Sequence, residues 1–403
     1  MPDTMRKKIG LFLSADPHGG GAFQYSQSLL NAALALPDDR YELIVACASS
    51  NWKSLMPEDS IKILQLRSEG FIWRRFSGKF WLLMGIPLSF WHKCYPFLIP
   101  DVRHILRENC DLWIFPAQDT WSYILPVPSL SVIHDLMHRY ERRFPEVSNG
   151  LTFRQREKHY KYICRHSKGI LVDSEVGKIH VMESYQVNEN ILHVLPYIAP
   201  SYIDKEETNF KNNLKYDLPQ KFFFYPAQFW KHKNHEQLVR TVGNLLDRIP
   251  ELKMVFAGSP KNAYSEVKTL VSNLSLSDHI IFLGYIPDED MASIYRRARA
   301  LIMPTFFGPT NIPPLEAFSL GCPVAVSNIY GMPEQVGNAA LLFDPSSETE
   351  MAEVMHRLWT DEELCKTLSR KGKERAATWN KVGFQKRFEA ILNSLTTKNN
   401  RHQ

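Results

Sequence analysis

The sequence has few cysteines, no long apolar run and no strong excess of one charge. Its six cysteines lie far apart among 403 residues without a CxxC pair, so neither a zinc site nor a disulfide framework is indicated. A reducing cytoplasm fits this cysteine usage best. The longest apolar stretch, residues 80–91, contains Pro87 and is too short to cross a bilayer. The apolar run near the N-terminus is too short for a signal peptide, so we expect a first strand there.

Net charge and composition exclude further classes of protein. The net charge of +5 suits phosphate-bearing ligands or anionic lipid, but it falls short of the strongly basic pattern of nucleic-acid-binding proteins. We therefore expect no nucleic-acid partner. Apolar residues make up 44% of the chain and charged residues 23%, which is ordinary for a folded globular protein. No repeat of 20–50 residues is visible, so a solenoid is not expected.

Strand-like runs alternate with helical patterns along nearly the whole chain, which predicts parallel sheets covered by helices on both faces. The chain is also longer than one hydrophobic core usually serves, which predicts two domains. A polar segment with proline at both ends places their boundary near residue 205. We expect an α/β fold with Rossmann-like, doubly wound domains at 1–205 and 206–378, and a last helix within 379–403 that packs back on the first domain. The strand-like runs are KKIGLFLS, YELIVACA, IKILQL, DLWIFPA, LSVIHDL, GILVDS and ILHVLPY, then FFFYPAQ, LKMVFAG, HIIFLGY, ALIMPT, PVAVSN and AALLFD.

A glycine-rich turn follows the first predicted strand, which ends at Ser14. Gly19, Gly20 and Gly21 allow the backbone to approach a ligand closely and leave the N–H groups of the following helix available to an anion. Gln24 stands where the third glycine of a GxGxxG motif would be, which disfavours a dinucleotide site. A plain tight turn is the alternative interpretation.

Two lysines follow the first strand of the second half. Lys231 and Lys233 lie at the carboxyl edge of the predicted sheet, where open α/β sheets bind their ligands and where lysine can neutralise phosphate. Solvated surface lysines are the alternative.

The most informative segment is MPTFFGPTNIPPLEAFSLGCPVAVSN. Asn311 is a candidate N-cap for a helix whose first turn tolerates Pro313 and Pro314. The N–H of Ile312 and the helix dipole suit a diphosphate, and Glu316, about one turn further on, is suited to ribose hydroxyls. Alternatively, Glu316 is a first-turn acid that interacts favourably with the dipole.

These segments resemble the retaining glycosyltransferases of family 4, which have the GT-B fold. The second domain of that family reads EGFGLPPLEAMACGCPVI where this chain has GPTNIPPLEAFSLGCPVA. The segments FFFYPAQFWKHKNHEQLV, LKMVFAG, IIFLGYIPDEDMASIYRRARALIMP and PEQVGNAALLFDP follow in the family's order, and SVIHDL, ILVDSEVGKIH and the glycine turn match its first domain. Residues 50–105 match least. The resemblance implies two Rossmann-like domains that face each other across a cleft, with residues 1–205 as the acceptor domain and residues 206–378 as the nucleotide-sugar donor domain.

The resemblance also implies roles for individual residues. Glu316 binds the donor ribose, Lys233 the diphosphate, and the segment of Gly284 and Tyr285 the base. His134 lies near the donor sugar, so we expect it and Glu316 to be catalytic, although a lone histidine at a strand end is more often structural. The expected donor-binding residues are Gly20, Gly21, Gln228, Lys231, Lys233, Gly284, Tyr285, Gly308, Thr310, Asn311, Ile312 and Glu316.

The sequence departs from the family pattern at two positions. The first of two glutamates, which contacts the transferred sugar in the family, is Gly308 here, and an arginine that helps to neutralise the diphosphate is Gln228. Thr310 or Asn311 is a candidate for the lost sugar contact, and Lys231 for the lost positive charge.

The function implied is transfer of a hexose from a UDP- or GDP-linked donor to a glycan or lipid-linked acceptor in surface polysaccharide synthesis, with mannose weakly preferred and anomeric configuration retained. Lysine and helix-dipole donors can stabilise the leaving nucleoside diphosphate without metal. No cofactor and no metal are expected, since Asp288–Asp290 has the pattern of a helix start.

A membrane contact and two other functional classes stay open. Residues 71–100 combine aromatic side chains with Arg74, Arg75, Lys79 and Lys93, a mixture suited to a membrane interface, although a buried helix is the alternative. We expect a cytoplasmic protein, with peripheral contact at the inner membrane surface. A nicotinamide-dependent oxidoreductase is disfavoured because GxGxxG is missing. A catalytically silent nucleotide-sugar or glycan-binding GT-B protein is favoured by Gly308.

Overall fold

The computed structural model describes residues 6–16, 20–47, 49–57, 61–66, 87–204 and 216–397. The chain forms two compact units. Unit 1 comprises Met1–Leu136, Phe153–Pro196 and Lys381–Gln403, and unit 2 comprises Met137–Thr152 and Tyr197–Asn380. The main passage between them therefore falls at Pro196–Tyr197, shortly before the boundary near residue 205 that the sequence predicts. Residues 205–215 of the predicted linker lie outside the described part.

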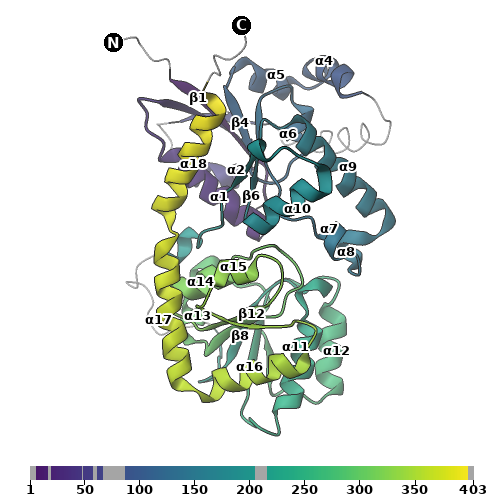
Figure 1. Cartoon of the computed structure of the whole chain (residues 1–403), viewed down its shortest axis with the longest axis vertical. Helices are drawn as coiled ribbons and strands as arrows, with labels where there is room; N and C mark the ends of the chain where they lie inside the picture. The colour runs from purple at the N-terminus through teal and green to yellow at the C-terminus, as the bar shows by residue number, and fades with distance from the viewer. Residues whose placement is uncertain are drawn as a thin grey trace. The chain divides into compact units, whose positions relative to one another are not determined.

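The described part of unit 1 contains a seven-stranded parallel sheet with the order β3-β2-β1-β4-β5-β6-β7. Figure 1 labels three of these strands, β1, β4 and β6. Each strand lies where the sequence predicts one. Because β1 and β4 are neighbours although β2 and β3 lie on the far side of β1, the order reverses between them, which makes this the switch point of a doubly wound sheet. The strands are β1 (Lys7–Leu13), β2 (Tyr41–Cys47), β3 (Lys62–Gln65), β4 (Leu112–Phe115), β5 (Ser129–Val132), β6 (Gly169–Val172) and β7 (Leu192–Val194).

The central strands of unit 1 form because they are almost uniformly apolar, as strands buried on both faces must be. All four residues of β4 are buried. Its Trp113 ring packs directly on Gly10 of β1, where a Cβ would come within 2.2 Å of the ring. The described helices of unit 1 are α1 (Gly21–Leu34), α2 (Ser50–Lys53), α4 (Leu88–Leu98), α5 (Pro100–Arg107), α6 (Trp121–Ile124), α9 (Gly150–His166), α10 (Glu175–Tyr185) and α18 (Lys381–Thr396); the first three residues of α9 belong to unit 2.

The C-terminal helix α18 belongs to unit 1, although it follows the last helix of unit 2 in the chain. It packs beside α1, as the yellow helix next to α1 in Figure 1 shows. The Gln385 side chain donates to the Ala35 carbonyl at 2.7 Å, and Asn393 accepts from Lys7 at 3.0 Å and from Tyr41 at 2.7 Å. Helix α18 is thus anchored to the first strands and the first helix of unit 1.

Unit 2 contains a six-stranded parallel sheet with the order β10-β9-β8-β11-β12-β13, and its switch point lies between β8 and β11. All six strands were predicted. They are β8 (Phe223–Pro226), β9 (Met254–Ala257), β10 (Ile280–Phe282), β11 (Ala300–Met303), β12 (Val324–Ser327) and β13 (Leu341–Phe343). The main helices are α11 (His235–Leu245), α12 (Tyr264–Asn273), α13 (Asp288–Arg297), α14 (Pro313–Leu320), α15 (Met332–Val336), α16 (Glu348–Thr360) and α17 (Glu362–Thr378). Asp288–Asp290 is the start of α13, as predicted.

A short segment from the first half of the sequence belongs to unit 2. Met137–Thr152 carries helices α7 (Met137–Tyr140) and α8 (Pro145–Ser148), and the prediction that it belongs to the first domain is wrong. Its apolar side chains Met137 and Val147 share a buried cluster with Phe306 and Phe307. We call residues 137–152 the clasp segment. Among the described residues, no helix is long and apolar enough to span a membrane.

Candidate functional site

The candidate site of unit 2 lies at its switch point, where the loops after β8 and β11 meet. Lys233 comes from the loop after β8, and Asn311 from the loop after β11. The Lys233 Nζ atom lies 3.4 Å from Asn311 Oδ1. Two of the predicted donor-binding residues, 78 positions apart in the chain, are thereby brought together. A ligand at the carboxyl edge of an open sheet binds at such a position.

The turn that carries Lys233 is fixed by hydrogen bonds to its backbone. Lys231–Lys233 forms a short 3₁₀ helix that ends at Asn234, which has a left-handed φ of 62°. The Tyr225 hydroxyl donates to the Lys233 carbonyl at 2.9 Å. Lys231, by contrast, forms an exposed ion pair of 3.0 Å with Glu266, and exposed pairs of this kind are weak. The structure thus orders Lys233 through its backbone and leaves Lys231 on the surface.

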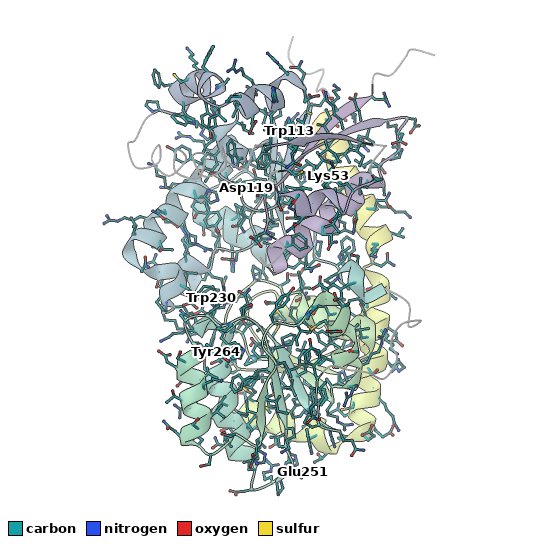
Figure 2. The ribbon with its side chains drawn as sticks, turned by 180° about the vertical axis from the view of Figure 1, so that it is seen from behind. Lys53, Trp113, Asp119, Trp230, Glu251 and Tyr264 are labelled. Atoms are coloured by element: carbon teal, nitrogen blue, oxygen red, sulfur yellow. The ribbon has the colours of Figure 1, made fainter. Side chains whose placement is uncertain are left out.

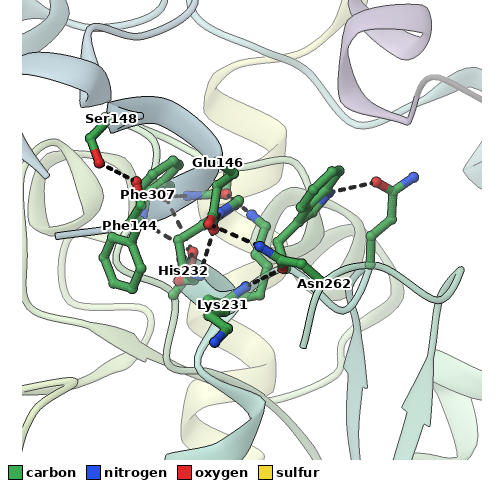
Figure 3. Close-up of polar contacts among 12 residues, drawn as sticks. Phe144, Glu146, Ser148, Lys231, His232, Asn262 and Phe307 are labelled. Carbon is green, nitrogen blue, oxygen red and sulfur yellow. Dashed lines mark hydrogen bonds and ion pairs between the residues drawn. The ribbon is translucent and has the colours of Figure 1, made fainter. Parts of the chain in front are cut away.

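The clasp segment holds this turn through one carboxylate, as Figure 3 shows. The Glu146 Oε1 atom accepts from the backbone N–H of His232 at 3.0 Å and from its Nδ1–H at 2.6 Å, and Oε2 accepts from the Asn262 amide at 3.2 Å. Burial alone would raise the pKa of Glu146, but the hydrogen bonds from His232 lower it to about 2. Glu146 therefore stays a carboxylate and binds His232 firmly.

His232 passes this restraint on to the loop after β11. Its carbonyl accepts from the Phe306 N–H at 2.8 Å, and its ring stacks on Phe307 with centroids 3.7 Å apart. Phe144 of the clasp segment packs on both phenylalanines with centroid distances of 5.4 Å. Both loops of the candidate site are therefore ordered by residues 144–146, which are distant from them in sequence.

The loop before α14 differs from its prediction at Asn311. The residue before the helix is Ile312, and Asn311 does not cap it; its amide donates to the Phe307 carbonyl at 3.1 Å instead. Gln335 holds the Asn311 backbone, accepting from its N–H at 3.0 Å and donating to its carbonyl at 2.6 Å. The N-cap prediction was wrong because the proline at 313 lets the helix begin one residue later, after Ile312.

Gly308 occupies a position that only glycine fits readily. Its φ is +90°, and a Cβ would lie 2.7 Å from the Thr310 carbonyl oxygen. The side chain of Thr310 is buried. A carboxylate at position 308 would therefore require a different loop backbone, so the departure from the family pattern is built into the loop.

Glu316 is held between two tyrosines. The Tyr202 hydroxyl donates to Oε1 at 2.5 Å, and the Tyr295 hydroxyl donates to Oε2 at 2.6 Å. The side chain is 6% exposed. Burial raises the pKa of Glu316, and the two hydroxyls oppose that rise. Because each carboxylate oxygen has two lone pairs, each can accept one further hydrogen bond.

The predicted base-binding segment follows β10. Gly284 has a φ of +73° with open space where a Cβ would be, and its carbonyl accepts from the Gly258 N–H at 2.7 Å. Tyr285 is 56% exposed, so its ring is accessible for stacking. Gln228 follows the central strand β8 at the same edge, and its side chain accepts from the indole N–H of Trp230 at 3.0 Å (Trp230 is labelled in Figure 2).

The predicted residues of unit 1 lie at the carboxyl edge of its own sheet. Gly20, with a φ of +64°, precedes α1, which begins at Gly21. His134 follows β5, and its Nε2–H donates to the Pro116 carbonyl at 3.2 Å. Burial lowers the pKa of His134 to about 4, against the opposing effects of Asp135 and of the Pro116 hydrogen bond. His134 is therefore a neutral imidazole at neutral pH and interacts with ligands by hydrogen bonding or contact.

Sequence reasoning missed several residues that order these sites. It did not single out Tyr202, Tyr295, Glu146, Gln335 or Asp119. Tyr202 lay in the presumed linker, and Glu146 in a segment assigned to the other domain. Their partners are 114 and 86 positions away. No local pattern carries such contacts.

No metal site is evident in the part of the chain that the structure describes, where no three His, Cys, Asp or Glu side chains gather as metal ligands would. Metal independence stays a prediction, because it concerns the reaction.

Comparison with known proteins identifies the fold. The structure is similar to that of Anabaena Alr3699/HepE in complex with UDP, with a TM-score of 0.67 at 17% identity over 96% of this chain and 100% of that one. The two parallel-sheet units, with this likeness over nearly the whole chain, define the GT-B fold.

Comparison of sequences identifies the second unit. Residues 205–375 match the family described as Glycosyl transferases group 1. The chain is similar to mannosylfructose-phosphate synthase of Agrobacterium fabrum, at 24% identity over 77% of this chain and 75% of that protein. It is also similar to the O-antigen chain mannosyltransferase B of Escherichia coli, at 46% identity over 67 residues, only 17% of this chain and 18% of that protein.

The contribution of the Tyr202–Glu316 hydrogen bond to the stability of the fold is expected to depend on pH. We expect Tyr202→Phe to destabilise the protein by about 1–3 kcal/mol at neutral pH, because it removes a hydrogen bond to a buried carboxylate. The folded-state pKa of Glu316 is raised, so its carboxyl group becomes protonated below that pKa and the cost should then shrink. Denaturant unfolding at neutral and at acidic pH measures both. An equal loss at both pH values contradicts the assignment. Tyr216→Phe, which removes a partly buried hydroxyl bonded to Asp290, is the control.

The contacts of the clasp segment lead to a prediction about nucleotide binding and stability. Glu146→Gln should weaken binding of UDP or GDP several-fold, because the Lys231–Lys233 turn loses its charged anchor. The variant should also have a lower free energy of unfolding. Because the pKa of Glu146 is about 2 in the folded state, against 4.5 in the unfolded state, this loss of stability is fully present above pH 4.5 and disappears as the pH falls through about 2. Calorimetric titration and denaturant unfolding measure the two effects. Glu236→Gln, which breaks an exposed pair with Arg240, should change neither. Unchanged nucleotide affinity in Glu146→Gln would exclude this role.

Proposed function

We propose that the chain is a retaining hexosyltransferase that uses a nucleotide diphosphate sugar as donor. The observation that carries the proposal is the meeting of Lys233 and Asn311 at the switch point of a group 1 glycosyl transferase domain. A diphosphate bound there gains negative charge as the sugar–phosphate bond breaks, and a positioned lysine stabilises that charge without rearrangement. The likeness to a protein whose structure contains UDP supports a nucleotide donor. We propose that this donor is bound as a substrate and that no further cofactor takes part.

The start of α14 offers less to the diphosphate than an ordinary helix N-terminus. Pro313 and Pro314 have no N–H, and the N–H groups of Leu315 and Glu316 both bond to the Ile312 carbonyl. The backbone of this turn can therefore bind the diphosphate only through the Ile312 N–H and the helix dipole. Lys233 therefore carries most of the proposed charge stabilisation, and its loss should be severe.

Glu316 is proposed to bind the donor ribose. Its carboxylate is buried, oriented by Tyr202 and Tyr295, and retains a lone pair on each oxygen for ribose hydroxyls. We propose His134, a neutral imidazole at a strand end of unit 1, as the contact to the donor sugar. The Gly20–Gly21 backbone is proposed to approach the donor, and Gly284 and Tyr285 its base.

The proposed donor is GDP- or UDP-linked, with mannose preferred, and the proposed acceptor is a glycan or lipid-linked saccharide in surface polysaccharide synthesis. Similarity to a mannosylfructose-phosphate synthase and an O-antigen chain mannosyltransferase supports the sugar. A second candidate is a catalytically silent nucleotide-sugar-binding protein, which the glycine-specific backbone of Gly308 favours, since the family's sugar-contacting glutamate has no counterpart there.

Donor cleavage tests the proposal. We expect the purified protein to release nucleoside diphosphate from one member of a panel of UDP- and GDP-sugars, also in EDTA. Glu316→Gln and Lys233→Ala should each reduce the release by at least about 100-fold, because each removes a charged contact to the donor. Lys253→Ala, at the amino end of β9 and thus the opposite edge of the sheet, should leave it unchanged.

The alternatives give different results. Tight donor binding without release, with or without glycan acceptors, favours the silent protein. Loss of activity in EDTA that Mg²⁺ restores contradicts metal independence. Failure to bind any nucleotide sugar excludes both candidates.

We propose that unit 1 also contacts an anionic membrane surface, where a lipid-linked acceptor would lie, so that the protein works at the cytoplasmic face. Phe90, Lys93 and Phe97 lie on one face of α4 by helical spacing, and the two phenylalanines are 58% and 79% exposed. Exposed Arg103 and Arg107 follow on α5. Exposed aromatic rings beside cationic side chains suit a membrane interface. Arg74, Arg75 and Lys79 of the sequence prediction lie outside the described residues.

Vesicle binding tests this surface. The protein should co-sediment with phosphatidylglycerol-containing vesicles, and a Phe90→Ala/Phe97→Ala double variant should lose most of that binding, because it removes the apolar side chains that would insert. Val382→Ala, which truncates a residue of similar exposure on α18, should bind as the wild type does. Equal binding of both variants would refute the assignment.

A further inference from the structure

The switch point of unit 1 carries a polar pair that the proposed donor chemistry does not use. Ser14 directly follows β1, and Asp119 lies in the loop after β4 (Asp119 is labelled in Figure 2). These two strands are neighbours at the point where the strand order reverses. The Ser14 hydroxyl lies 2.7 and 2.6 Å from the two carboxylate oxygens of Asp119. The pair therefore occupies the position at which an open α/β sheet binds a ligand.

The surroundings of Asp119 do not compensate its charge. Among the described residues it has no ion-pair partner, and the hydrogen bond from Ser14 is its charge-stabilising contact. Burial raises the pKa of Asp119 to about 6, against the lowering effect of Ser14. At neutral pH it is a carboxylate whose desolvation weakens the fold. A residue that costs stability where ligands bind is typical of a binding site.

The charge of the pair selects the class of ligand. A carboxylate accepts hydrogen bonds and repels phosphate, so this position suits hydroxyl groups better than the donor diphosphate. Each Asp119 oxygen retains a lone pair beyond the bond from Ser14, and sugar rings present adjacent hydroxyls as donors. Asp119 also lies three residues beyond Pro116, whose carbonyl holds His134. The pair and the imidazole proposed to contact the donor sugar thus belong to neighbouring strand ends.

We propose that Asp119, oriented by Ser14, binds a hydroxyl group of the saccharide acceptor at the switch point of unit 1. This inference rests on the proposed glycosyl transfer, since it names a residue for its second substrate. Asp119 binds the acceptor through hydrogen bonds, and the reaction requires no proton transfer to it. The strand order thus gives each unit one substrate site, with cationic Lys233 facing the diphosphate in unit 2 and anionic Asp119 facing hydroxyl groups in unit 1.

The test compares Asp119→Asn with the wild type in stability and in acceptor use. Asparagine keeps the size of the side chain and removes the charge, so the thermal midpoint should rise by a few degrees at about pH 7.5. Because the folded pKa of about 6 lies above the unfolded value of 3.8, the cost of the carboxylate fades between these values as the pH falls. The gain should therefore be smaller at about pH 5. A merely structural aspartate would give a loss of stability.

Acceptor use is measured with methyl α-mannoside and methyl α-glucoside at high concentration as probes. In the wild type, at least one should raise nucleoside diphosphate release above the hydrolysis seen without acceptor. In Asp119→Asn the stimulated rate should fall about tenfold or more, while hydrolysis without acceptor and donor affinity stay unchanged. Asp111→Asn, which removes a carboxylate bonded to the Lys8 N–H at the amino end of the same strand, should leave the stimulation unchanged.

Several results of the Asp119→Asn experiments would contradict the proposal, and each points to a different cause. A lower thermal midpoint at neutral pH shows that Asp119 is structural. An equal fall in hydrolysis and in stimulated release assigns it to the donor. Wild-type release that neither glycoside stimulates, or stimulation that survives in Asp119→Asn, contradicts the hydroxyl-binding role. If the wild type neither binds nor hydrolyses any nucleotide sugar, the proposed function itself fails, which is a different result from all of these.

Discussion

Both candidate sites depend on one constraint of parallel sheets. Consecutive strands of such a sheet are joined by helices on its faces, and where the strand order reverses, the loops of two neighbouring strands turn toward opposite faces. Between β1 and β4 this separation places Ser14 and Asp119 at one edge, and between β8 and β11 it places Lys233 and Asn311 at another. The two positions are alike in geometry but opposite in charge. The sequence places a carboxylate at the first edge and an ammonium group at the second.

Loops at such an edge need restraints that the strands alone do not give. In unit 2 the clasp segment supplies them, since Glu146 binds His232, and His232 in turn holds Phe306 and stacks on Phe307. Gln335 fixes the backbone of Asn311 from a third element, α15. The positions of Lys233 and Asn311 are therefore set by side chains that are not expected to touch the donor.

The sequence predicted every strand of both sheets and most of the site's loops, because apolar runs and proline- or glycine-containing turns are local signals. It could not predict the contacts that order them. The environment of Glu316 depends on Tyr202, 114 residues away, and the fold places that tyrosine. Asn311 was expected to cap α14, yet the proline at 313 and the hold of Gln335 displaced it from that position. Assignment of residues 137–152 to unit 2 likewise rests on long-range packing with Phe306 and Phe307.

The pKa values of three carboxyl groups differ in a way that distinguishes a structural role from a proposed binding role. Hydrogen bonds from His232 lower the pKa of Glu146, so its charge favours the folded state. Burial raises the pKa of Glu316 and of Asp119, so their charges oppose folding at neutral pH. A buried acid that only stabilised the structure would be expected to resemble Glu146. Glu316 and Asp119 lie at strand-order reversals or beside them and carry an energetic cost, which agrees with the hydroxyl-binding roles proposed for them.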